Sequence, residues 1–201
     1  MSPHEKAMVS LVKKPLHSEE AREPTDLLLS CHGRIREFTQ MALAIAYAPS
    51  DAGVGRIVET TSRVRTYFSV GLPLHEHDEE LSVAPRLLDS AACAEVEDAL
   101  DQMAREHRVI DRTLRDLDEL WKVIVSAQED MPHVRDETRA LANALSAVFE
   151  AHLAIEERSI FPAIGRALSV ASRSALMQEM KSRRALETQA AAHRRPFPSI
   201  S

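Results

Sequence analysis

Residues 96–124 carry one continuous apolar stripe, and this stripe limits the fold more than any other feature of the chain. Its members recur at alternating steps of three and four residues, which is the spacing that places side chains on one face of an α-helix. The stripe therefore predicts one long helix with a buried face, and His107 is its one ionisable member. The members are Val96, Leu100, Met103, His107, Ile110, Leu114, Leu117, Trp121 and Ile124.

The same periodicity predicts helices over residues 25–48, 55–88 and 134–168, and a last helical stretch over 172–192. The chain has five glycines in 201 residues and is rich in Ala, Leu, Glu and Arg, a composition that favours helix over strand. Because the connections between these long amphipathic helices are short, consecutive helices are expected to lie antiparallel in a bundle.

We therefore expect an all-α fold, an up-down-up-down four-helix bundle with an extra C-terminal helix. The bundle is assigned to residues 25–168, after a flexible leader over 1–24 and before a C-terminal helix and tail over 169–201. Within the second helix, Gly71 and Pro73 predict a kink or a break, because a proline removes a backbone donor and clashes with the preceding turn.

Composition excludes several classes of function. The net charge is -6 and no basic stripe stands out, which argues against a nucleic-acid partner. No apolar run approaches the roughly 20 residues needed to cross a bilayer, and the leader lacks the apolar core of a signal peptide. Cys31 and Cys93 lie far apart in no metal or redox spacing, so we expect a reducing compartment and a cytoplasmic protein.

Residues 75–85, HEHDEELSVAP, and residues 152–162, HLAIEERSIFP, repeat one design. In each copy the histidine is followed by Glu after four residues, by a second Glu after five, and by Pro after ten. Another histidine lies on an apolar helix face upstream of each copy, His32 before the first and His107 before the second. The chain thus looks like two helical hairpins of the same design.

The spacing of the repeat predicts a metal site. Residues four apart lie one above the other on a helix, so His75 and Glu79 can point at one spot, as can His152 and Glu156. Imidazole and carboxylate together suit Fe, Mn or Zn. Two carboxylates among four histidines suggest two ions bridged by both carboxylates, roughly 3.5–4 Å apart. The predicted ligands are His32, His75, Glu79, His107, His152 and Glu156.

Ordinary structural roles are the alternative for each residue taken alone. A histidine in an apolar stripe is usually a core residue with one hydrogen-bond partner, and a His-x-x-x-Glu pair is common on helix surfaces. The repeat favours the metal site, because burying six polar side chains without an ion would cost several kcal/mol.

With these residues the chain resembles the hemerythrin-like family, also called the HHE cation-binding domain. The resemblance covers about residues 25–168 and implies an up-down four-helix bundle around a non-haem di-iron centre, oxo- or hydroxo-bridged, with Zn and Mn as alternatives. It rests on His32 and His107, on His75 with Glu79, on the stretch LPLHEHDEE, and on His152 with Glu156 followed by Ile160-Phe161-Pro162.

One position departs from the family. In hemerythrins the third helix offers two histidines one turn apart, whereas here Asp111 stands one turn after His107. Asp111 is a further possible ligand, or it orients His107, or it is an exposed charge. Tyr67, before the predicted kink, could also approach the centre, and Glu80 and Glu157 are expected to point outward or to orient a ligand.

The resemblance implies a protein that binds or senses a small diatomic ligand, O2 or NO. Three alternatives stay open: an enzyme acting on peroxide or NO at the same centre, iron storage or donation for metal-centre repair, and a bundle that holds zinc or no metal. The expected partners are a diatomic ligand or peroxide, with neither nucleic acid nor membrane, and a homodimer is left open.

Overall fold

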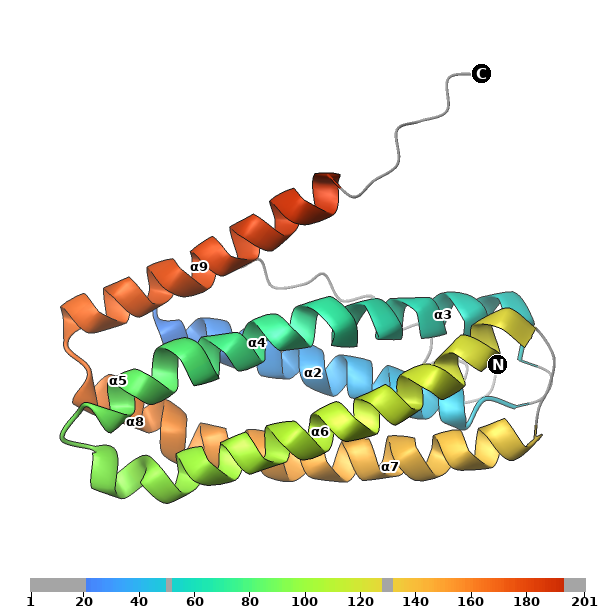
Figure 1. Cartoon of the computed structure of the whole chain (residues 1–201), viewed down its shortest axis with the longest axis horizontal. Helices are drawn as coiled ribbons and strands as arrows, with labels where there is room; N and C mark the ends of the chain where they lie inside the picture. Colours follow the sequence, from blue (N-terminus) through green and yellow to red (C-terminus); the bar gives the residue numbers. More distant parts are fainter. Residues whose placement is uncertain (1–20, 50–51, 128–131, 194–201) are drawn as a thin grey trace.

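The computed structural model describes residues 21–49, 52–127 and 132–193. These residues form a bundle of long helices, which confirms the all-α expectation (Figure 1). Most of the expected leader lies outside the described residues. The elements are α2 (Pro24–Ala46), α3 (Val54–Thr66), η1 (Tyr67–Gly71), α4 (Leu72–Asp78), η2 (Glu79–Val83), α5 (Ala84–Leu88), α6 (Cys93–Ala127), α7 (Pro132–Ile155), η3 (Glu156–Ile160), α8 (Phe161–Ala167) and α9 (Val170–His193), where η marks a π-helical turn.

Four antiparallel rods make the bundle: α2, the composite helix from α3 to α5, α6, and the composite helix from α7 to α8 (Figure 1). The fifth, α9, crosses the outside of the bundle over α2 and α4. Within the part of the chain that the structure describes, no helix combines the length and the apolar character needed to span a membrane.

The interior is divided into two apolar cores. The α9-side core includes Leu28 and Met103, and the aromatic core includes Ile35 and Ile110 together with Trp121. Along α2 and along α6, the apolar stripe passes from one core to the other within about two helical turns, and the upstream histidines of the sequence pattern, His32 and His107, stand midway in these two crossings. A layer of buried polar side chains therefore lies between the two apolar cores.

The backbone stays helical through Pro73, so of the kink or break predicted there, the break does not occur. A π-helical turn precedes this proline, and the same arrangement precedes Pro85 and Pro162. In each turn the closing N–H bonds to the carbonyl five residues back, as Ala84 does with Glu79. Because a proline ring in an α-helix clashes with the carbonyl four residues back, the wider turn relieves the clash without ending the helix.

Helix α9 is fastened to the bundle through Asp78, whose carboxylate is fully buried. Arg183 and Arg184 both pair with it, Arg184 over 2.6 Å, and Arg183 also donates to Ser82 over 2.8 Å. The apolar side of α9 adds Leu176 and other side chains to the α9-side core. The extra helix expected from the sequence is therefore part of the packed structure.

We predict that Asp78→Asn lowers the free energy of unfolding by about 2 kcal/mol, because it removes one partner of a buried ion pair while the partly exposed guanidinium groups regain some hydration. Urea unfolding of metal-depleted protein measures the change. The control is Asp116→Asn at an exposed position of α6, which should unfold like the unmodified protein. Equal stability of the two variants would contradict the structural role of Asp78.

Candidate metal centre

The six side chains predicted as ligands meet in the polar layer at the middle of the bundle. They come from α2, α4, η2, α6, α7 and η3, so every rod of the bundle contributes. All are buried, with at most 3% of any of them exposed. They are His32, His75, Glu79, His107, His152 and Glu156.

These side chains form two clusters that share both carboxylates. The first cluster adds His32 and His75 to the shared pair, and the second cluster adds His107 and His152. In each cluster one ligand atom per residue lies within 4.8 Å of the others. Two ligands on opposite sides of one ion, each bound at 2.0–2.2 Å, would be about 4.2 Å apart, so both clusters have the size of a metal site.

Each carboxylate turns one oxygen toward each cluster. Glu156 places Oε2 3.0 Å from Nε2 of His32 and Oε1 3.0 Å from Nε2 of His152. Glu79 places Oε1 3.3 Å from Nε2 of His75 and Oε2 3.5 Å from Nε2 of His107. This is the arrangement that two bridging carboxylates require.

The short contacts lack hydrogen-bond geometry, and this fits a metal rather than a polar network. The buried atoms without a hydrogen-bond partner include both oxygens of Glu79 and of Glu156 and the Nε2 atoms of three histidines, His32, His75 and His107. Buried polar atoms left without partners cost about 1–3 kcal/mol each. Their lone pairs converge on two common points, and a cation at each point would satisfy them.

Burial sets the protonation of these groups. It raises the pKa of Glu156 to about 8, with the Glu79 carboxylate as the next cause, and it raises the pKa of Glu79 well above its usual range. It lowers the pKa of His152 to about 3 and that of His75 well below its usual value. The imidazoles of His75 and His152 are therefore neutral, as metal ligands must be, whereas the carboxyl groups of Glu79 and Glu156 need a nearby cation to ionise at neutral pH.

Three carboxylates lie behind the histidines. Glu157 accepts a hydrogen bond from Nδ1 of His32 over 2.8 Å, and Glu80 accepts one from Nδ1 of His107 over 2.7 Å. Since an ionised carboxylate can only accept, each of these Nδ1 atoms carries the proton, and the Nε2 lone pair faces the cluster. The glutamates that follow the two shared carboxylates in sequence thus fix the ring orientations of His32 and His107.

The third outer carboxylate is Glu106, whose Oε2 accepts from Nδ1 of His152 over 3.1 Å. Glu106 was not predicted from the sequence, because its bond to His152 joins α6 to α7 across 46 positions and no repeat marks it. Glu76 was missed as well: its Oε1 is buried without a partner among the described residues, and burial raises its pKa to about 7. Its position between His75 and the first shared carboxylate was the available signal.

Two other sequence candidates lie apart from the clusters. Asp111 is exposed and belongs to neither cluster. The ring of Tyr67 stacks on Phe38 at 4.0 Å between centroids, below the Arg34 guanidinium, and belongs to neither cluster. A Cβ atom at position 71 would lie 2.8 Å from the Tyr67 ring, so glycine at this position of the π-turn leaves room for the ring.

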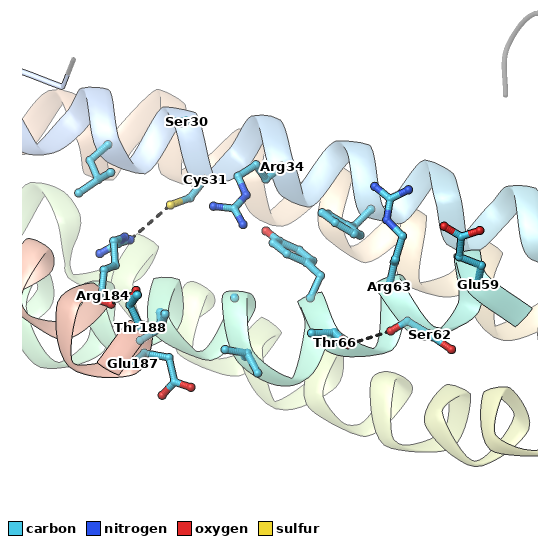
Figure 2. A pocket seen from close by; sticks show the side chains of 16 residues that line it. Ser30, Cys31, Arg34, Glu59, Ser62, Arg63, Thr66, Arg184, Glu187 and Thr188 are labelled. Carbon is cyan, nitrogen blue, oxygen red and sulfur yellow. Dashed lines mark hydrogen bonds between the residues drawn. The ribbon is translucent and has the colours of Figure 1, made fainter. Parts of the chain in front are cut away.

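Tyr67 instead lines a groove on the outer side of the bundle, between α2, the α3–α4 region and α9 (Figure 2). Arg184 reaches across this groove from α9, and its guanidinium lies 3.4 Å from the sulfur of Cys31. Burial raises the pKa of the Cys31 thiol, so this thiol stays protonated at neutral pH.

Comparison with known proteins assigns the chain to a family. The model of the hemerythrin HHE cation-binding domain matches residues 23–164, and a second match covers residues 98–187, which begins within the second helical hairpin. An uncharacterized protein of Haemophilus influenzae is 23% identical over 136 residues, which is 67% of this chain and 75% of the relative. The chain therefore belongs to the hemerythrin HHE cation-binding domain family.

Proposed function

We propose that the protein is a non-haem di-iron protein that binds or senses a small diatomic ligand, O2 or NO. The observation that carries the proposal is the convergence of buried, unpartnered nitrogen and oxygen atoms on two points that share both carboxylates. Nitrogen and oxygen donors without thiolate suit iron, and the family is a cation-binding one.

Each residue has a defined part in this proposal. His32 and His75 hold one ion, His107 and His152 hold the other, and Glu79 and Glu156 hold both. When bound, a ferrous pair would supply open coordination positions and electrons for a diatomic ligand. The two apolar cores above and below the polar layer keep bulk water away, which strengthens every electrostatic contact inside it.

The exposed position of Asp111 favours the enzyme alternative, in which the centre acts on peroxide or NO. With Asp111 as a ligand, the two ions would differ in the number of protein donors, as a carrier with one binding position requires. Without it, each cluster offers two imidazoles and two carboxylate oxygens, and both ions keep room for an added ligand. Iron storage or donation has no comparable support from the site.

Metal analysis tests the proposal directly. Protein purified under low oxygen should contain about two irons per chain, the number that two bridged positions require. Its optical spectrum should change on adding O2 or NO, and a stable new band would indicate binding. Steady release of O2 from peroxide would instead support the enzyme. One zinc per chain, or no metal, would remove the di-iron proposal.

Ligand variants locate the centre. Glu79→Ala and Glu156→Ala should each lose most of the bound iron, because each removes a donor from both positions. Asp111→Ala should keep its iron, as should Glu97→Ala, a matched control at an exposed position of α6. Full metal content in both Glu79→Ala and Glu156→Ala would show that the ligand assignment is wrong.

The pKa shifts predict how pH acts on the metal-free protein. The pKa of Glu156 rises from 4.5 to about 8 on folding, so its contribution to stability is complete below pH 4.5 and is lost as pH rises toward 8. The pKa of His152 falls from 6.5 to about 3, so its contribution is complete above pH 6.5 and is lost on acidification. Between pH 4.5 and 6.5 the two groups change the free energy of unfolding in opposite directions, and of these two only the loss from Glu156 continues above pH 6.5.

The free energy of unfolding of chelator-treated protein should therefore fall between pH 6.5 and 8. The slope should approach about 1.4 kcal/mol per pH unit for each carboxyl group that stays protonated in the folded chain. Urea unfolding at a series of pH values measures this, with iron-loaded protein as the control, in which bound cations keep the carboxylates ionised. A flat profile in the chelated protein would contradict the assignment of a buried protonated carboxyl.

A further inference from the structure

Both imidazoles of the second cluster are supported by carboxylates on their outer nitrogens. Nδ1 of His107 donates to Glu80, and Nδ1 of His152 donates to Glu106. The Glu106 side chain is 16% exposed, and its other oxygen accepts a hydrogen bond from Gln102 over 2.8 Å. The acceptor behind His152 is thus held in place from a second side.

The first cluster has weaker outer support. Nδ1 of His32 donates to Oε1 of Glu157, but the Arg36 guanidinium binds the same oxygen, also at 2.8 Å. A cation on the acceptor withdraws negative charge from the bond to the imidazole. Nδ1 of His75 is buried and has no hydrogen-bond partner within the described residues.

Outer partners of this kind affect metal affinity. A carboxylate behind a ligating histidine fixes the tautomer and the ring orientation, and it raises the basicity of the nitrogen that faces the metal. Loss of one such partner typically costs 10–100-fold in metal affinity. The two clusters offer the same inner ligands, so the difference between them lies in this outer support.

We propose that the two metal positions are unequal: the second cluster binds its ion first and more tightly, and the first cluster fills last and empties first. Glu106 and Glu80 act as positioning residues that create the difference. The proposal rests on the metal centre of the proposed function and adds an order of loading. Since one more carboxylate supports the second cluster and Arg36 weakens the support of the first, the affinities should differ by at least about tenfold.

Cobalt titration of the metal-free full-length chain tests the order of loading. Co²⁺ is added under nitrogen, native mass spectrometry counts the ions per chain, and visible absorption follows their coordination. We expect a one-cobalt species to accumulate before the two-cobalt species. His75→Ala should retain one tightly bound cobalt, whereas His152→Ala should lose the tight step.

Matched outer variants then test the cause. Glu106→Gln removes the charge behind His152 with little change in shape and should weaken the first step by about 10–100-fold. Glu157→Gln makes the same change behind His32 and should weaken the second step alone. Circular dichroism checks that both variants stay helical, and the cobalt absorption of the one-cobalt species should shift in Glu106→Gln but not in Glu157→Gln.

The possible failures are distinguishable. Two cobalt ions binding with the affinities of identical sites, or a first step weakened by Glu157→Gln but not by Glu106→Gln, would overturn the inequality and leave the di-metal centre standing. Retention of the tight ion in His152→Ala and its loss in His75→Ala would reverse the order and also overturn the proposal. Failure of the unmodified chain to bind any cobalt would instead remove the centre itself.

Discussion

The structure depends on a layer of unpartnered polar atoms held between two apolar cores. The side-chain carboxylates of Glu79 and Glu156 are fully buried in this layer. An uncompensated charge is strongly unfavourable there, because water does not solvate it. Packing in the α9-side core and in the aromatic core holds the rods in place on either side of this layer. The donor atoms therefore cannot move apart to reduce the repulsion between their lone pairs. The packing energy of the two cores maintains an arrangement that would be costly without cations.

The π-helical turns explain why the sequence repeat ends in proline. In η2 and η3 the turn begins at the shared carboxylate and is followed by Pro85 and Pro162. The wider turn changes the angle between consecutive side chains, so two adjacent glutamates can serve different ends of an imidazole. His107 illustrates this, with Glu79 facing its Nε2 and Glu80 accepting from its Nδ1. Proline thus specifies a local geometry that the centre uses.

Much of this could be predicted from the sequence, and the reasons are local. Apolar periodicity predicted the four rods and the inward positions of His32 and His107, and the i, i+4 spacing placed the other four side chains that the structure brings together. The role of all six as ligands stays a prediction. What was missed depends on contacts between helices. Glu106 meets His152 across two rods, and Asp111 follows the helical spacing from His107 yet is exposed. Helical continuity at Pro73 required a π-turn, which propensities do not reveal.

The attachment of α9 has a consequence for the order in which the molecule is made. Arg183 and Arg184 are synthesised after all four rods of the bundle, since a ribosome adds residues from the N-terminus onward. Until they emerge, the side-chain carboxylate of Asp78, the residue next to Glu79 in the sequence, lacks its two cationic partners. The nascent bundle can collapse around its apolar cores earlier, but the buried carboxylate beside Glu79 acquires its two cationic partners only after α9 has been synthesised.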